Sequence, residues 1–304
     1  MSPRDLFLYV SCVLIWGTTW LAITFQLGSV PVDVSVAYRF GLAAALLVAY
    51  CLWRRVPLRF SPRQHGFMAL QGFFLFGLNY VLTYNAERFI SSGLTAVGFT
   101  AIVFFNILGT RILFGTPMTV PVLSGALLGA LGIALVFWRD LVAIDPSRNV
   151  ALGLGVILGA AAVSSIGNLL SAWNQKRGLP ILQSNAIGMA YGALFVSVLA
   201  LLQGEEFRIE TSASYLLSLV YLALFGTVLA FGAYLSLLGR IGPDKAGYAS
   251  ILFPLVALGL STWIEGFVWH LSTVAGLCLS LVGNVVILTK RRRSGLRRRL
   301  PGPP

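Results

Sequence analysis

The uncharged stretch LFLYVSCVLIWGTTWLAITFQL, Leu6–Leu27, decides the class of fold. It contains no Asp, Glu, Lys, Arg or His. A helix of about 20 apolar residues, with a rise of about 1.5 Å per residue, spans the roughly 30 Å hydrocarbon core of a membrane. The stretch is too long for the core of a signal peptide, and no A-x-A-like cleavage site follows it. We therefore expect a retained transmembrane helix here.

Similar apolar stretches recur along the whole chain of 304 residues. Hydrophobic residues make up 57% of the sequence and charged residues only 11%, compared with roughly 25% charged residues in soluble domains. Turn residues and charges divide the chain into ten apolar runs with short connections, which leaves no room for a water-soluble domain. The expected spans are 6–27, 32–53, 65–86, 91–113, 119–138, 151–174, 181–203, 213–238, 243–264 and 272–289.

The distribution of basic residues predicts the orientation in the membrane. The net charge of +12 does not indicate a nucleic-acid partner, because the Lys and Arg residues lie in short linkers and in the tail Lys290–Leu300. With Arg39 and Arg111 assigned to the nearer membrane face, 17 of the 22 Lys and Arg residues fall on the side of the amino terminus. Because basic loops face the cytoplasm, we expect both termini to be cytoplasmic.

A weak internal repeat relates the two halves of the chain. With a shift of about 152 positions, RFISS at 88–92 meets RIGPD at 240–244, a short polar link before an apolar run in each case. Two halves of five spans each insert with opposite orientations, which is typical of secondary transporters that work by alternating access. The predicted fold is an all-α integral membrane protein with ten transmembrane helices in a 5+5 inverted repeat. The expected divisions are 1–138 for the first repeat, 139–289 for the inverted second repeat and 290–304 for a basic cytoplasmic tail.

No charged side chain is expected in the middle of a span. All ten Asp and Glu residues and both His residues fall in linkers or within a turn or two of a span end. The pattern does not indicate a proton relay, and we expect a neutral or zwitterionic substrate that is moved passively. The three cysteines lack the spacing of a metal site. No catalytic residue, metal or cofactor is predicted.

Neutral polar and aromatic side chains recur at helical spacing inside the expected spans. Buried amide and hydroxyl groups need partners, so they face a cavity or a neighbouring helix and not lipid. Aromatic walls with a few polar groups suit a small ligand, although the same residue types also form interfacial belts and helix contacts. The predicted substrate-binding residues are Trp16, Thr19, Trp20, Asn79, Tyr80, Thr83, Tyr84, Ser164, Asn168, Tyr234 and Tyr248.

Proline and glycine predict two further features. Pro254 lies in the middle of the expected ninth span, where it removes a helical hydrogen bond and favours a kink. We interpret the kink as a hinge for rocking, with a static bend as the alternative. Glycines give the fifth and tenth spans small faces where helices can approach closely. These glycines are Gly125, Gly129, Gly132, Gly276 and Gly283.

Eight short segments occur in a recognisable order: Ile15–Trp20 (IWGTTW), Arg39-Phe40, Arg54-Arg55, Asn79–Ala86, Gly226-Thr227, Ala233–Gly242, Phe253-Pro254 and Glu265-Gly266. In this order the chain resembles the drug/metabolite transporter superfamily, in its EamA group of ten-span permeases. It departs from the group at Ile102, where a proline matching Pro254 is common, and at Gly115-Thr116, which replaces Gly-Glu. We therefore expect the two halves to bend unequally.

The resemblance implies a multi-pass carrier of the bacterial inner membrane with a central cavity lined by spans 1, 3, 4, 6, 8 and 9. Members of the group move amino acids, other small metabolites or drugs, generally outward, and the chain is similar to bacterial exporters of aromatic amino acids. The expected function is export of small metabolites, chiefly aromatic and other neutral amino acids. The expected partners are a zwitterionic or neutral small molecule and the lipid bilayer, with the chain as a monomer.

Other functions stay open. The same superfamily includes carriers of drugs, nucleosides and phosphorylated or nucleotide-linked sugars, but a phosphate carrier requires Lys or Arg in the cavity, where the sequence places none. An integral membrane enzyme that processes lipids requires convergent His, carboxylate or nucleophilic groups, and no such constellation is visible. A channel-like or structural protein is compatible with the composition, although the repeat favours alternating access.

Overall fold

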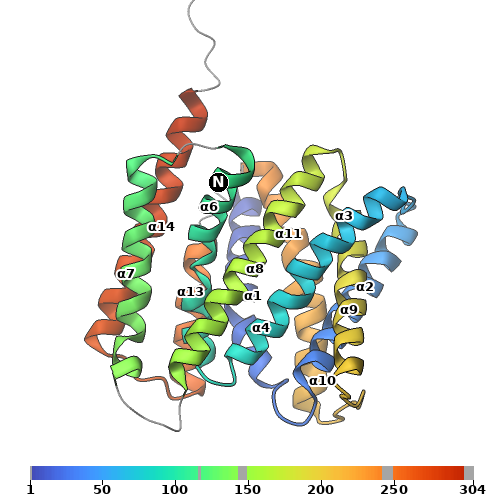
Figure 1. Ribbon diagram of the computed structural model, residues 1–304, viewed down its shortest axis with the longest axis horizontal. Coiled ribbons are helices and arrows are strands. Elements are labelled where there is room, and N and C mark those ends of the chain that lie inside the picture. The colour runs from blue at the N-terminus through green and yellow to red at the C-terminus, as the bar shows by residue number, and fades with distance from the viewer. Residues whose placement is uncertain (1, 116–117, 143–148, 242–248, 298–304) are drawn as a thin grey trace, which may run out of the picture.

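The chain folds into a bundle of helices in the computed structural model, which describes residues 2–115, 118–142, 149–241 and 249–297 (Figure 1). No strand occurs among these residues. Two segments, η1 and η2, are π-helical, with hydrogen bonds that reach back five residues instead of four. The elements are α1 (Pro3–Thr24), α2 (Val32–Trp53), α3 (Pro62–Gly72), η1 (Phe73–Leu78), α4 (Asn79–Ala86), α5 (Ser92–Phe99), α6 (Ile102–Phe114), α7 (Val120–Val142), α8 (Val150–Lys176), α9 (Ile181–Leu202), α10 (Ala213–Val220), η2 (Tyr221–Leu229), α11 (Ala230–Ile241), α13 (Ala249–Ile264) and α14 (Leu271–Arg297).

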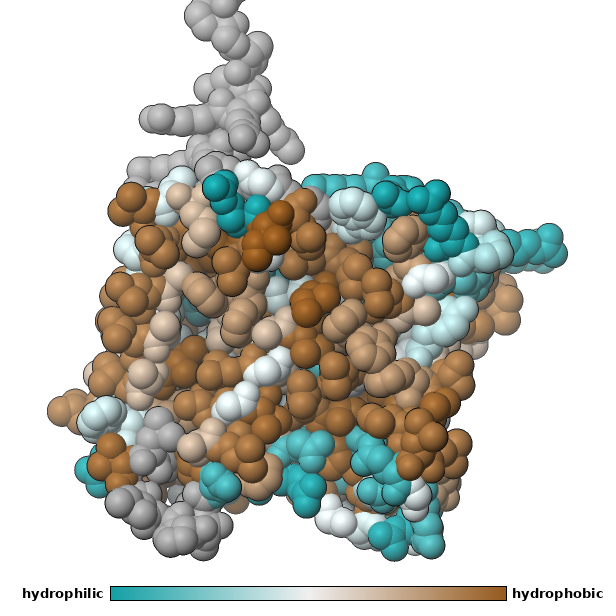
Figure 2. Space-filling view, viewed as in Figure 1, coloured by the Kyte–Doolittle hydropathy of each residue, from teal (hydrophilic) through white to brown (hydrophobic). Residues whose placement is uncertain are grey.

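The dimensions and the surface of the bundle suit a bilayer. Within the described residues, eight helical segments are long and apolar enough to cross a membrane, and the two shorter apolar helices are Leu252–Ile264 and Leu271–Ile287. On α7, the large side chains of Leu123, Leu127 and Leu131 form an exposed row at i, i+4 spacing. Figure 2 shows a hydrophobic surface around the middle of the molecule, with hydrophilic residues gathered toward its two ends. Lipid is the solvent that such a surface requires.

Serine and proline fix the start of two helices that enter the membrane. Ser2-Pro3 precedes α1 and Ser61-Pro62 precedes α3, and both serines form capping boxes. In the second box, the Ser61 hydroxyl accepts a hydrogen bond from the Gln64 backbone at 3.3 Å, and the Gln64 side chain accepts one from the Ser61 backbone at 2.8 Å. Proline suits the first helical turn because that turn has no hydrogen-bond partner for its N–H groups.

Where the structure describes them, the predicted spans lie on helical segments, and residues 243–248 of the ninth lie outside the described residues. The geometry within three of the spans differs from that of a simple helix. The third and eighth spans contain η1 and η2. The fourth is interrupted at Thr100 and Ala101, between α5 and α6. There the Thr100 backbone N–H and hydroxyl both donate to the Val97 carbonyl oxygen, at 3.0 and 2.6 Å, which tightens the last turn of α5. The fourth span therefore breaks without a proline at Ile102, whereas α13 continues through Pro254.

The glycine faces of α7 and α14 pack directly against each other, which confirms the close approach expected from their small residues. A Cβ atom on Gly132 would lie 2.5 Å from the Gly276 carbonyl oxygen, and one on Gly125 would lie 2.7 Å from that of Gly283. Backbone fills the space that a side chain would need. In Figure 1 these two helices form one side of the bundle, and the amino terminus and the last turns of α14 lie at the same end.

Candidate functional site

A cavity of about 310 Å³ lies between the helices, within the size range of small-molecule sites. The six spans that were expected to line a cavity all contribute to it, through α1, η1, α4, α5, α6, α8, η2, α11 and α13. One residue of α2, Arg39, also lines it. The site thus combines side chains from both halves of the sequence.

The structure brings nine of the predicted binding residues together around this cavity. They are Trp16, Thr19, Trp20, Asn79, Tyr80, Thr83, Ser164, Asn168 and Tyr234. Tyr84 does not line the cavity but is fully buried beside it, and Tyr248 lies outside the described residues. Pro254 is buried within α13, next to the cavity-lining Phe253, and its role as a hinge stays a prediction.

Aromatic rings form one wall of the cavity. The ring centroid of Trp16 lies 5.1 Å from that of Tyr234 and 5.6 Å from that of Phe231, both on α11. Trp20 contacts Phe99 of α5 and Phe253 of α13, with centroids 5.3 and 6.0 Å apart. These distances are those of favourable aromatic pairs. The two tryptophans of α1 therefore join the first half of the chain to the second through ring contacts.

The position of Trp16 depends on η2. The Trp16 indole Nε1 donates a hydrogen bond of 3.3 Å to the Gly226 carbonyl oxygen, in the middle of η2. A Cβ atom on Gly226 would lie 2.6 Å from Cγ2 of Thr19, so glycine also allows α1 to approach. Wide π turns are frequent at functional sites. Here the wide turn supplies the acceptor that orients a cavity-lining ring.

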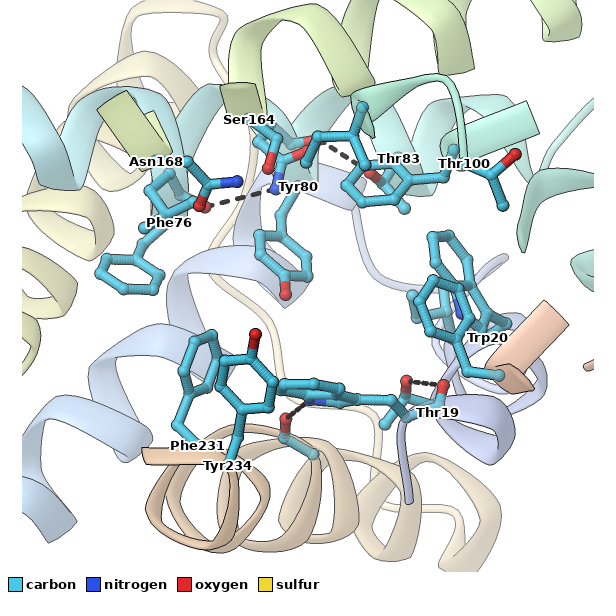
Figure 3. Close-up of a pocket in the computed structure, with 18 of the residues that line it drawn as sticks. Thr19, Trp20, Phe76, Tyr80, Thr83, Thr100, Ser164, Asn168, Phe231 and Tyr234 are labelled. Atoms are coloured by element: carbon cyan, nitrogen blue, oxygen red, sulfur yellow. Dashed lines mark hydrogen bonds between the residues drawn. The ribbon is translucent and has the colours of Figure 1, made fainter. Parts of the chain in front are cut away.

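Amide and hydroxyl groups gather on the other side of the cavity. Asn79 and Thr83 lie on α4, and Ser164 and Asn168 lie on α8. The Asn79 amide nitrogen donates to the Leu75 carbonyl oxygen at 3.3 Å, and the Thr83 hydroxyl donates to the Asn79 carbonyl oxygen at 2.9 Å. In Figure 3 the hydroxyl groups of Tyr80 and Tyr234 face the open space from opposite sides. The cavity can therefore receive a ligand that has both an apolar and a polar part.

The expectation that the cavity contains no Lys or Arg is wrong. Arg39 was assigned to the nearer membrane face, but its side chain is only 2% exposed and lines the cavity. Its guanidinium carbon lies 4.6 Å from the ring centroid of Tyr80 and 5.3 Å from that of Phe40. Arg39 shares its helix face with the buried Val36 and Ala43. This small, apolar face at i−3 and i+4 is the sequence signal that could have placed Arg39 inside.

A chain of hydrogen bonds positions Arg39 through side chains that do not line the cavity. Nη1 of Arg39 donates to the Tyr84 hydroxyl at 3.3 Å, and that hydroxyl donates to Oε1 of Gln26 at 3.5 Å. Nε2 of Gln26 donates in turn to the Ser218 hydroxyl of α10 at 3.1 Å. All four side chains are buried. Tyr84 thus acts on the cavity through Arg39 and does not form part of the lining.

Two carboxylates, one from each half, lie near each other where α4 and α13 end and α5 begins. The Glu265 carboxylate accepts hydrogen bonds from the Ser92 backbone, at 3.2 Å, and from the Ser92 hydroxyl. Glu87, directly after α4, is 8% exposed, and neither of its carboxylate oxygens has a hydrogen-bond partner among the described residues. Burial raises the pKa of Glu87 well above its usual range, the charge of Glu265 raises it further, and Arg39 lowers it. Among the described residues, no group of three His, Cys, Asp or Glu side chains could hold a metal ion.

The helices, the apolar surface and the cavity between the helices are those expected of an integral membrane carrier. The sequence matches the EamA-like transporter family over residues 4–138 and again over 151–289. The chain belongs to this family. It is therefore a membrane transporter, and relatives of the chain are named as transporters and efflux pumps.

Individual relatives agree with this assignment over most of their length. The chain is 28% identical to the "Uncharacterized inner membrane transporter YedA" of Escherichia coli K12, covering 90% of this chain and 87% of that one. It is 26% identical to a "Probable amino-acid metabolite efflux pump" of Salmonella typhimurium, covering 93% and 94%. A solved structure titled only "Crystal structure of protein" has the same fold, with a TM-score of 0.68, 17% identity and coverage of 95% and 98%. The chain is a multi-pass protein of the bacterial inner membrane.

Proposed function

We propose that this transporter exports small neutral or zwitterionic metabolites, chiefly aromatic and other neutral amino acids. Cargo binds in the central cavity, and two inverted halves of five spans each rock around it so that the cavity opens alternately to each side. Both termini lie in the cytoplasm. The chain works as a monomer without a cofactor.

The observation that carries this proposal is the lining of the cavity. Rings of Trp16, Trp20 and Tyr234 offer an apolar surface to a flat side chain, and the amides and hydroxyls opposite offer hydrogen bonds. The rings come from both halves, so their contacts change when the halves move. A cavity at the boundary between moving halves is where a carrier binds its cargo.

Drugs and nucleosides are the second candidate cargo, because an aromatic wall also accepts their rings. Sugar phosphates are disfavoured. Arg39 is the one Lys or Arg side chain that lines the cavity among the described residues, whereas a phosphate dianion calls for more than one positive charge.

The test is uptake of radiolabelled aromatic and aliphatic amino acids into liposomes that contain the purified protein. We expect uptake of neutral amino acids without a proton gradient, and its loss in Trp16→Ala and Tyr80→Ala. Trp138→Ala and Tyr50→Ala are matched controls, because these rings are 57% and 44% exposed on the outer surface.

The uptake experiment separates the proposed cargo and mechanism from their alternatives. Uptake that is lost in the two cavity variants and kept in the two surface variants supports the proposal. Absence of uptake of any amino acid by folded wild-type protein would contradict the proposed cargo, and the same liposomes would then be tested with nucleosides and cationic dyes. Uptake that needs a proton gradient would contradict passive transport.

A further inference from the structure

Three side chains that line the cavity carry buried polar atoms without a hydrogen-bond partner among the described residues: Nε of Arg39 and the side-chain carbonyl oxygens of Asn79 and Asn106. A buried donor or acceptor without a partner is costly, because it has lost water and gained nothing in return. Such groups are therefore expected to meet a partner that is absent from the protein itself. One group is a cationic donor, and the other two are acceptors.

The Arg39 guanidinium is arranged to receive a carboxylate. It forms no ion pair with any described residue, although it is 2% exposed. The Tyr80 and Phe40 rings and the Tyr84 hydroxyl position it, while Nε, on its edge, stays free. A guanidinium binds a carboxylate through N–H groups along an edge, and the pairing is strong where water is excluded.

The Asn79 side chain is oriented so that its oxygen can accept a hydrogen bond from a ligand. Its amide nitrogen donates to the Leu75 carbonyl oxygen, which fixes the orientation of the amide and leaves the oxygen without a partner. Asn79 is 3% exposed and directly precedes Tyr80, the residue whose ring lies under Arg39. Asn106 supplies a second unpaired oxygen from α6. An ammonium group has three donors and no acceptor, so it suits such oxygens.

We propose that Arg39 binds the carboxylate of an α-amino acid and that Asn79, with Asn106, binds its ammonium group, while the aromatic wall receives the side chain. This inference rests on the proposed function and names the groups that select the cargo. It makes Arg39 a specificity-determining residue: compounds that lack a carboxylate leave a buried cation unpaired and are rejected.

The first test uses the wild-type protein in detergent and measures how ligands raise its melting temperature. The probes share one ring: L-phenylalanine, 3-phenylpropionate without the ammonium group, and 2-phenylethylamine without the carboxylate. We expect the concentration for half-maximal stabilisation to be lowest for phenylalanine and at least about tenfold higher for phenylethylamine. Equal stabilisation by phenylalanine and phenylethylamine would overturn the proposal. So would the absence of stabilisation by both phenylalanine and phenylpropionate, the two probes that carry a carboxylate.

Variants then assign the two ends of the ligand. In Arg39→Gln, the concentration of phenylalanine for half-maximal stabilisation is expected to rise to that of phenylethylamine. Arg39→Lys should keep part of the preference for phenylalanine over phenylethylamine, because the charge remains. Asn79→Leu is expected to remove the difference between phenylalanine and phenylpropionate. Arg63→Gln, at an exposed site on α3, is the matched control and should leave all three probes unchanged. A folded Arg39→Lys or Arg39→Gln protein with wild-type discrimination would refute the role of Arg39.

Transport of the same probes in liposomes separates this proposal from the proposed function. Binding that depends on Arg39 without movement of phenylalanine would remove the export function and keep the recognition site. Uptake of phenylalanine by Arg39→Gln at the wild-type rate would keep the export function and remove the recognition site.

Discussion

The π-helical segments η1 and η2 occupy matching places in the two halves of the chain, but they surround the cavity with different chemistry. After η1, α4 carries Asn79, Tyr80 and Thr83, and the guanidinium of Arg39 on α2 lies against the Tyr80 ring. In the second half, η2 and α11 contribute Gly226, Phe231 and Tyr234. The segment after η1 thus brings amide and hydroxyl groups beside the charge of Arg39, whereas η2 and α11 bring aromatic rings and a backbone carbonyl. The backbone pattern repeats, while the side chains differ in a way that would orient an asymmetric cargo.

The largest effect is expected from the glycine of η2. Gly226→Ala places a methyl group 2.6 Å from Thr19 Cγ2 and disturbs the acceptor of Trp16, and such overpacking costs about 1–3 kcal/mol. We predict loss of most transport and a lower melting temperature. In η1, a Cβ atom on Gly77 would lie 3.2 and 3.4 Å from the side chains of Phe195 and Val196 and 3.5 Å from the Gly192 carbonyl oxygen, so Gly77→Ala should cost less. Equal losses in both variants would contradict the difference between the two segments.

A smaller effect is expected when the Trp16 hydrogen bond is removed and a smaller aromatic ring is kept. Trp16→Phe keeps an aromatic ring but loses the donor to the Gly226 carbonyl oxygen. A hydrogen bond of this kind contributes about 0.5–1.5 kcal/mol, so amino-acid affinity should fall by roughly two- to twelvefold. Trp138→Phe on the exposed face of α7 should have no effect on affinity. Unchanged affinity in Trp16→Phe would show that η2 does not orient the ring.

The two carboxylates at the junction of the halves give a pH-dependent comparison. Glu87 has a raised pKa because it is buried near Glu265. The folded state then binds a proton more tightly than the unfolded state, so stability is lost as the pH rises above the unfolded value of about 4.3 and through the folded value. Glu87→Gln should remove this loss and raise the melting temperature at alkaline pH. Glu265→Gln weakens the hydrogen bonds with Ser92 but also removes the charge that raises the pKa of Glu87, so the melting temperature should fall less steeply with rising pH than in the wild type. A wild-type melting temperature that does not change between pH 5 and 9 would contradict burial of Glu87.

The smallest effect is expected at the ion pair between Asp5 of α1 and Arg240 of α11, which joins the two halves through residues that do not line the cavity. The Arg240 side chain is 41% exposed, and exposed pairs contribute about 0–1 kcal/mol. Asp5→Asn should therefore change transport less than twofold in liposomes at physiological salt. A loss as large as that of Trp16→Phe would mean that this contact closes the cavity.

Hydropathy predicted the helices well because membrane thickness and backbone hydrogen bonding constrain them strongly. The segment expected at 32–53 is α2, Val32–Trp53. The same method misplaced Arg39, since it places a charge at the nearer membrane face and carries no information on which neighbours surround a helix. Tyr84 shares its spacing with cavity residues, but only the structure shows it buried behind Arg39. The π turns were not predicted, because five-residue hydrogen bonding leaves no regular hydrophobic period in so short a segment.

An experimental structure of the protein with L-phenylalanine bound tests the central claim most directly. We expect the ligand in the central cavity, with its carboxylate within about 3 Å of the Arg39 guanidinium, its ammonium group at the Asn79 side-chain oxygen and its ring against Trp16 and Tyr234. A phenylalanine molecule bound elsewhere, or one in the cavity with its carboxylate turned away from Arg39, would contradict it.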